Sequence, residues 1–102
     1  MTDGLGPLIE AARRETDRRL GARPEAAGHA LDPVHAMLAS IDRQLRFMAG
    51  VVASGEAPTM EQVNGLTLGV IAVREFEVDD PAYCDLLCDA AFLFKALATG
   101  PA

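Results

Sequence analysis

Four helix start signals divide the sequence. Two of them are an aspartate followed by a proline. The aspartate can accept a hydrogen bond from a free backbone N–H, and proline suits the first helical position because it has no N–H to satisfy. The signals stand at Pro7, Asp32-Pro33, the capping box that begins at Thr59, and Asp80-Pro81. They predict an all-α fold, a compact bundle of four main helices, with one extra short turn around Pro24 to Gly28.

Apolar spacing supports helices in the first half of the chain. One stripe recurs every three or four residues at Val34, Leu38, Ile41, Leu45, Met48 and Val52. A weaker stripe on the first helix holds Leu5, Leu8, Ile9, Ala12, Thr16 and Leu20. Because 102 residues are close to the common size of one domain, we expect residues 1–102 to form a single helical domain.

The segment LTLGVIAVREFEVDDP, residues 66–81, is the most ambiguous in secondary structure. Its Val and Ile residues favour a strand, but its apolar and polar residues do not alternate as they do in a half-buried strand. A helix that begins at the capping box would bury one face, formed by Val63, Leu66, Val70 and Val73. Gly69 would let a neighbouring helix approach closely. We therefore predict one continuous helix, with a buried strand as the alternative.

The last predicted helix, from Pro81 to about Ala98, is apolar on nearly all sides. Its acids Asp85 and Asp89 fall on the same side as Phe92. A helix that is apolar all round is buried or meets a partner, and so small a bundle can hardly enclose one of its helices. We expect the outer side of this helix to be a contact surface, with Phe92 packed against a partner or a second subunit.

The net charge of −6 lies entirely in residues 51–102. An acidic half repels nucleic acid and anionic membranes and favours basic partners. The arginines between Arg13 and Arg23 alternate with acids at helical spacing, which predicts a solvated helix face, with a phosphate-binding patch as the alternative. Since the sequence has neither a signal-peptide pattern nor an apolar run of about 20 residues, we expect a cytoplasmic protein.

Candidates for chemistry are few. Cys84 and Cys88 lie one helical turn apart, but a zinc site would need a second pair of ligands, and a disulfide across one turn would distort the helix. The acids from Glu75 to Asp80 lie at a helix junction, where they stay hydrated and ionised. We expect no catalytic residue, no metal and no cofactor, and a small acidic enzyme is the less favoured alternative.

Three segments together resemble a known family. Leu66–Phe76, Asp80-Pro81 and the segment DRQLRFM at Asp42–Met48 are similar to small helical immunity proteins of bacterial type VI secretion, over roughly residues 33–100. The toxins that such proteins neutralise are NAD(P)+ glycohydrolases or, in related systems, (p)ppApp synthetases. The resemblance implies a protein that binds its cognate toxin domain and occludes the nucleotide-binding active site without catalysis.

The expected interface combines apolar anchors with acids that attract basic groups of the toxin. The anchors are Phe92 and Phe47. The acids are Glu75, Glu77, Asp79, Asp80, Asp85 and Asp89. The rival hypothesis is a homodimerising or regulatory helical module without a toxin partner, in which the last helix pairs with its own copy.

Overall fold

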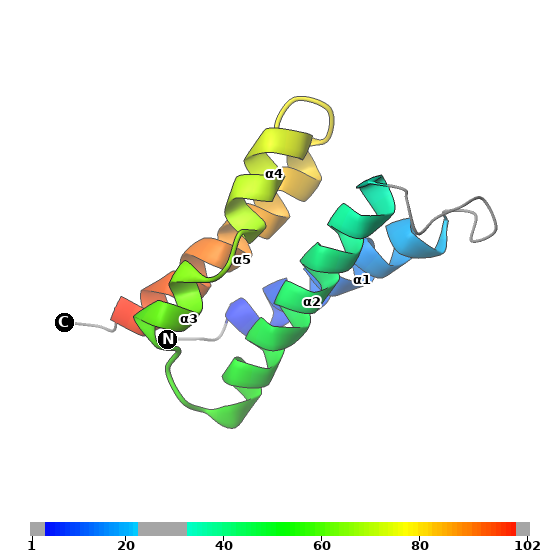
Figure 1. Cartoon of the computed structure of the whole chain (residues 1–102). Helices are drawn as coiled ribbons and strands as arrows, with labels where there is room; N and C mark the ends of the chain where they lie inside the picture. The colour runs from blue at the N-terminus through cyan, green and yellow to red at the C-terminus, as the bar shows by residue number, and fades with distance from the viewer. Residues whose placement is uncertain (1–3, 23–32, 100–102) are drawn as a thin grey trace.

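A computed structural model describes residues 4–22 and 33–99 of the chain (Figure 1). The helices are α1 (Leu5–Gly21), α2 (Pro33–Ser54), α3 (Met60–Asn64), α4 (Leu68–Phe76) and α5 (Pro81–Thr99). The described residues contain no strand, so the predicted all-α class is confirmed. The extra turn predicted around Pro24 to Gly28 lies outside these residues.

Helix α5 connects the two parts of the bundle. It packs against α1 on one side and against α3 and α4 on the other, and α1 packs in turn against α2 (Figure 1). The core between the helices is built from Leu5, Ile9, Ala12, Leu38, Ile41, Leu45, Met48, Leu68, Ile71, Ala72, Tyr83, Cys84, Leu87, Ala90 and Phe94. The functional surface must therefore be sought on the outer sides of these helices.

The stripe predicted for α2 is confirmed over its centre, where Leu38, Ile41, Leu45 and Met48 are buried. Its ends are not in the core, since Val34 is 41% exposed and Val52 is half-buried. Gly55 ends the helix as predicted, with a φ of 80° that glycine adopts at little cost.

The third predicted helix is divided in two. Its capping box forms as expected, with Gln62 N donating to Thr59 Oγ1 at 3.0 Å and Thr59 N donating to Gln62 Oε1 at 2.9 Å. The chain then leaves the helix at Gly65. Gln44 of α2 fixes this break: its Oε1 accepts from Thr67 N at 2.8 Å and its Nε2 donates to Thr67 Oγ1 at 3.0 Å. Because the Thr67 N–H is bonded to a side chain, it does not join a continuous helix.

The break changes which side chains of α4 are buried. Leu68, Ile71 and Ala72 point into the core. Val70 and Val73, which we predicted to be buried, are 65% and 48% exposed. The prediction of one continuous helix with these valines inside is therefore wrong, because α4 restarts at a new rotation after Thr67.

Candidate protein-binding surface on α4 and α5

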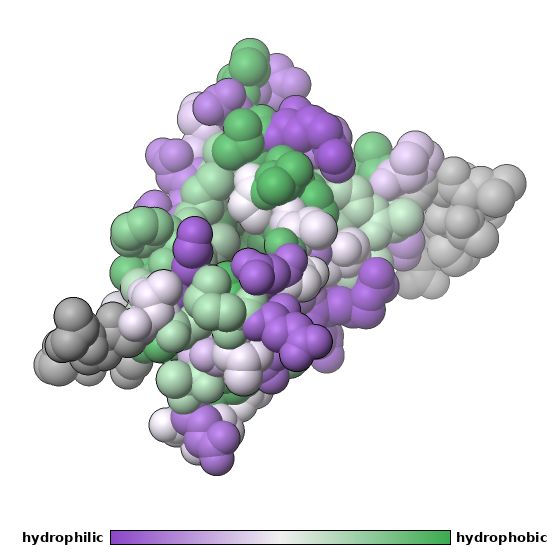
Figure 2. Space-filling view, turned by 60° about the vertical axis from the view of Figure 1, so that its left-hand side comes forward, coloured by the Kyte–Doolittle hydropathy of each residue, from purple (hydrophilic) through white to green (hydrophobic). Residues whose placement is uncertain are grey.

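Helices α4 and α5 share an apolar surface, which we call the α4–α5 face. Its most exposed members are Val70 and Val73 of α4 and Phe92 of α5, which are 65%, 48% and 70% exposed. Beside them runs a groove of about 360 Å³ lined by Val63, Leu66, Gly69, Val70, Ala91 and Lys95. Figure 2 shows green apolar side chains among purple polar ones over the upper part of the molecule, at the height of α4 in Figure 1.

The orientation of α5 follows from its helical period. Its buried side consists of Tyr83, Cys84, Leu87, Ala90 and Phe94. Phe92 lies about 200° around the helix from Phe94 and therefore points away from the core. The exposed acids Asp85 and Asp89 share this outer side, as predicted. An exposed phenylalanine beside exposed valines is typical of a surface that meets a partner.

Gly69 lies where α4 meets α5. A Cβ at this position would lie 3.8 Å from the Cβ of Ala91, which is an ordinary contact distance. An alanine would therefore fit here without displacing Ala91, so the approach of the two helices does not require glycine, contrary to the prediction. The small pair leaves the floor of the groove open between the larger side chains of Leu66 and Val70.

Residues 60–99 contain two cationic side chains, Arg74 and Lys95, which differ in whether they form an ion pair. Arg74 donates to Glu75 Oε2 at 2.9 Å. Lys95 is exposed at the edge of the groove, and in the part of the chain that the structure describes no carboxylate lies within ion-pair distance of it. Lys95 therefore remains available to an acidic group of another molecule.

The predicted acids do not behave as one group. Glu77 and Asp79 are exposed in the turn between α4 and α5, on either side of Val78, which is 87% exposed. Glu75 is also exposed, but its carboxylate forms an ion pair with Arg74. Glu77 and Asp79 therefore contribute the most accessible negative charge at this end of the molecule.

Asp80 has a structural role in the chain. Its Oδ1 accepts from Tyr83 N at 3.4 Å at the start of α5, and its Oδ2 forms an ion pair with Arg19 of α1. The hydrogen bond from Arg19 lowers the pKa of the Asp80 carboxyl below its usual value, and the capping bond from Tyr83 lowers it further. Asp80 is thus a helix cap, as the sequence suggested, and its charge is already paired.

Phe47 is separated from Phe92. It is 40% exposed on α2 and packs edge-on against Phe94, with 6.3 Å between ring centroids. Phe94 belongs to the buried side of α5, opposite Phe92. The two predicted anchors therefore lie on different sides of α5 and do not form one surface.

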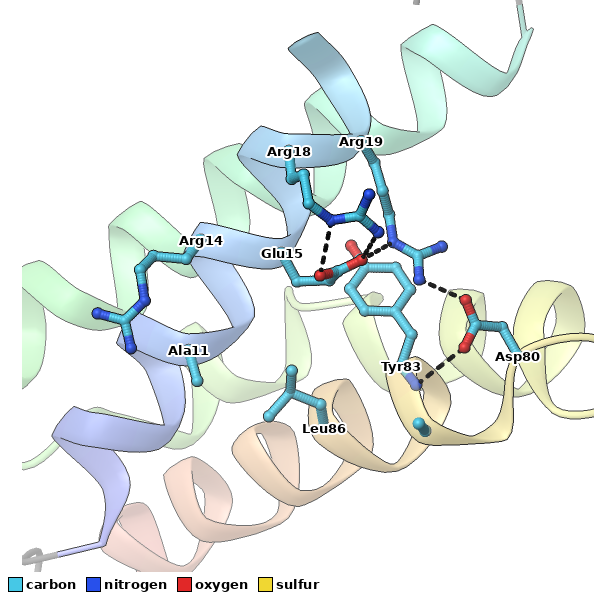
Figure 3. A pocket seen from close by; sticks show the side chains of 9 residues that line it. Ala11, Arg14, Glu15, Arg18, Arg19, Asp80, Tyr83 and Leu86 are labelled. Carbon is cyan, nitrogen blue, oxygen red and sulfur yellow. Dashed lines mark hydrogen bonds and ion pairs between the residues drawn. The ribbon is translucent and has the colours of Figure 1, made fainter. Parts of the chain in front are cut away.

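Sequence reasoning missed the arrangement around Arg19 (Figure 3). Its guanidinium carbon lies 3.9 Å from the ring centroid of Tyr83, and its Nε donates to Glu15 at 2.7 Å. The hydroxyls of Tyr83 and Thr16 are 2.6 Å apart in the core. Residues far apart in sequence thus join α1 to the start of α5. The alternating charges on α1 were the available signal, but they do not reveal a partner 61 positions away.

Arg13, Arg18 and Arg19 are paired with acids on α1, in agreement with the favoured prediction, whereas Arg23 lies outside the described residues. Glu15 accepts hydrogen bonds from both Arg18 and Arg19, and Glu10 pairs with Arg13 at 3.7 Å in place of the expected Arg14. A pocket of about 540 Å³ between α1 and α5 contains this network. Figure 3 shows Arg14, which also lines the pocket, extending along α1 away from this network. Arg18 and Arg19 are neutralised by Glu15 and Asp80, so among the described residues Arg14 is the lining cation of this pocket without an ion pair.

The ion pairs of Arg19 predict a loss of stability in acid. The pKa of Asp80 and of Glu15 is lower in the folded chain because hydrogen bonds from Arg19 and Arg18, respectively, favour the charged carboxylates. Their stabilising effect is fully present above the unfolded pKa of about 4 and is lost as pH falls through the folded value. In urea unfolding at pH 7, 5 and 3, Asp80→Asn should be less stable than wild type at pH 7, and the difference should shrink at pH 3. A difference that does not change with pH would contradict this ion-pair role.

The cysteines lie at the inner edge of α5. Their sulfur atoms are 3.9 Å apart, and both thiols are free. Burial, together with the neighbouring Cys84, raises the pKa of the Cys88 thiol to about 11. Cys88 is therefore a neutral thiol at pH 7, a form that favours packing over nucleophilic or metal-binding chemistry.

The described residues provide neither a metal-binding cluster nor a membrane-spanning helix. Residues 4–22 and 33–99 contain no group of three or more His, Cys, Asp or Glu side chains placed to hold a metal ion. None of the helices in these ranges is both long and apolar enough to cross a membrane.

A small helical bundle with an open apolar face has the features of a protein-binding module. Comparison with known protein families shows which kind of protein-binding module it is. Residues 6–96 match the family model Tsi6, and the chain belongs to this family of type VI secretion immunity proteins. The family consists of non-enzymatic toxin inhibitors, so membership implies an antitoxin role. The match begins in α1, further towards the N-terminus than the resemblance expected from residue 33. Comparison with curated proteins and with solved structures gave no match.

Proposed function

We propose that this protein binds its cognate type VI toxin domain through the α4–α5 face and occludes the nucleotide-binding site of the toxin. The toxin class would be an NAD(P)+ glycohydrolase or a (p)ppApp synthetase. The observation that carries the proposal is the exposure of Phe92, Val70 and Val73 on adjacent helices of a family member whose role is inhibition. The site of action would be the cytoplasm of the cell that makes the toxin.

The energetics favour a few apolar anchors. An immunity protein must hold its toxin at low cellular concentrations, which requires a Kd of about 1 nM or less, or roughly −12 kcal/mol. A few large side chains usually supply most of such an energy when they become fully desolvated. Phe92 is the largest exposed side chain of the face, and the groove beside it can receive an apolar side chain of the toxin.

The acids near the face would act mainly on the association rate. A toxin that holds nucleotide phosphates needs basic groups at its active site, and exposed acids attract such groups at long range. Glu77, Asp79, Asp85 and Asp89 are the exposed members of the predicted set without an ion pair among the described residues. Asp80 is excluded from this role because Arg19 already pairs with it.

Charge reversal in the turn after α4 tests this steering. Glu77→Lys combined with Asp79→Lys should slow association with the toxin about tenfold at low salt, and the difference should shrink as salt rises. Surface plasmon resonance at several ionic strengths measures this rate. The matched control is Asp17→Lys with Glu56→Lys, which changes the net charge equally at exposed positions outside the predicted acidic set. Equal slowing by both pairs would show that net charge, rather than the position of these acids, sets the rate.

The proposed function itself is tested with the toxin domain encoded beside this chain. Purified protein at equimolar excess should abolish NAD(P)+ hydrolysis or (p)ppApp synthesis by that domain, and a saturating nucleotide analogue should slow formation of the complex. A toxin that remains fully active would refute the proposal. A complex that inhibits but forms equally fast with the nucleotide site filled would refute occlusion alone.

A further inference from the structure

The outer side of α5 has a charge pattern that complements itself. Phe92 stands near its middle, Asp89 lies three residues before it, and Lys95 lies three residues after it. All three side chains are exposed. We infer that this side binds a second copy of the chain, with the two α5 helices antiparallel about a two-fold axis close to Phe92.

The antiparallel geometry determines which residues face each other. In such a pair, a residue at a given distance before the axis lies level with the residue at the same distance after it on the other copy. Asp89 therefore lies level with Lys95 of the second copy, and symmetry provides the same pair twice. Asp85 lies level with Thr99, whose hydroxyl already donates to Ala96 O at 3.1 Å, so this position adds no like-charge repulsion and no further charge pair.

Other arrangements use the same side less well. Two parallel α5 helices would place Asp85 and Asp89 against their own copies, and like charges facing each other are destabilising. A partner with only basic groups would pair with Asp85 and Asp89 but would repel Lys95. The antiparallel second copy satisfies both signs of charge with residues already present on the helix.

Apolar contacts accompany the charge pairs. Phe92 is 70% exposed and would meet its own copy at the axis, beside the groove floored by Ala91. Val70 and Val73 of α4 extend the apolar surface next to α5. Dimerisation would remove the exposed apolar surface of Phe92, Val70 and Val73 from water, which favours association.

The pair should be weak. One helix face buries less than the roughly 800 Å² per partner of a typical stable interface, and two copies that each carry −6 repel one another at long range. We therefore expect a dissociation constant in the micromolar range or weaker, so that the dimer forms only at higher concentrations. Because the pair uses Phe92, the proposed toxin contact and the second copy would compete for one surface.

Sedimentation velocity of the purified full chain over a wide concentration range tests this inference. Wild type should shift from monomer to dimer with rising concentration. Asp89→Lys and Lys95→Asp should each weaken the dimer at least tenfold, because each places like charges level across the axis. The double variant D89K/K95D should restore dimerisation, since it exchanges the two charges and keeps both pairs.

The matched control is Leu93→Ala, which truncates an apolar side chain of α5 about 100° away from Phe92 and should leave the dimer unchanged. Wild type that stays monomeric up to about 1 mM would overturn the inference. A double variant that remains as monomeric as the single ones would overturn the antiparallel pairing. Circular dichroism confirms that each variant is folded. Neither negative result affects the toxin-inhibition assay, so failure of this inference is distinguishable from failure of the proposed function.

Discussion

Replacement of Phe92 by alanine is expected to weaken inhibition of the cognate toxin by about 30- to 1,000-fold, the range for loss of an interface residue worth 2–4 kcal/mol. The free protein should keep its stability to within about 0.5 kcal/mol, because the side chain is 70% exposed and contributes little to the core. Titration of toxin activity and urea unfolding of the free chain measure the two effects separately.

Phe94→Ala provides the contrasting variant on the same helix. Phe94 is fully buried, so its truncation should cost about 3–5 kcal/mol of stability. If Phe92→Ala also lost 3 kcal/mol or more, Phe92 would belong to the core in solution. If Phe92→Ala left both stability and inhibition unchanged, the toxin would bind elsewhere on the molecule, and the α4–α5 face would lose its proposed role.

Replacement of Tyr83 by alanine is expected to have an equally large effect on folding, a loss of about 3–5 kcal/mol in the free energy of unfolding. Tyr83 is 2% exposed, and its ring packs edge-on against Phe76 with centroids 4.8 Å apart. The same ring carries the Arg19 guanidinium on its face at 3.9 Å. A cavity at this position would separate α1 from the start of α5 and leave Arg19 without its aromatic support.

Tyr83→Phe separates the contribution of the ring from that of the hydroxyl. It keeps the ring contacts and removes the hydroxyl that lies 2.6 Å from Thr16 Oγ1, so it should cost about 1 kcal/mol. Thr16 still donates to Ala12 O at 2.8 Å and is not left unsatisfied. Urea unfolding followed by circular dichroism compares the variants. A cost for Tyr83→Ala no greater than that for Tyr83→Phe would show that the ring packing is unimportant.

Local sequence signals were sufficient for most of the helices. Capping residues and prolines depend on nearest neighbours: the Thr59 capping box forms as predicted, and α5 begins at Pro81. Pro7 is an exception, because α1 begins two residues before it, at Leu5. The outward side of α5 also follows from one helical period, which explains why the exposure of Phe92 could be predicted from the sequence. The same period predicted the centre of α2, where Leu38 to Met48 face the core.

Contacts between distant residues explain what the sequence did not reveal. The end of α3 depends on Gln44, which lies 23 positions before Thr67, and no local feature of residues 60–76 identifies that partner. The pairing of Arg19 with Asp80 spans 61 positions. Sequence reasoning therefore assigned Asp80 to a cap and to an open acidic cluster, although its charge is paired within the chain.

The Gln44–Thr67 contact has a consequence for how this family could diversify. The segment from Val63 to Val73 carries two apolar sides, and the point where α4 restarts decides which of them faces outward. A substitution at Gln44 that let residues 60–76 merge into one helix would turn Val70 and Val73 inward and present Leu68 and Ile71 to solvent instead. A single amide on α2, outside the α4–α5 face, therefore helps to determine which of two apolar sides of the same stretch of chain faces outward.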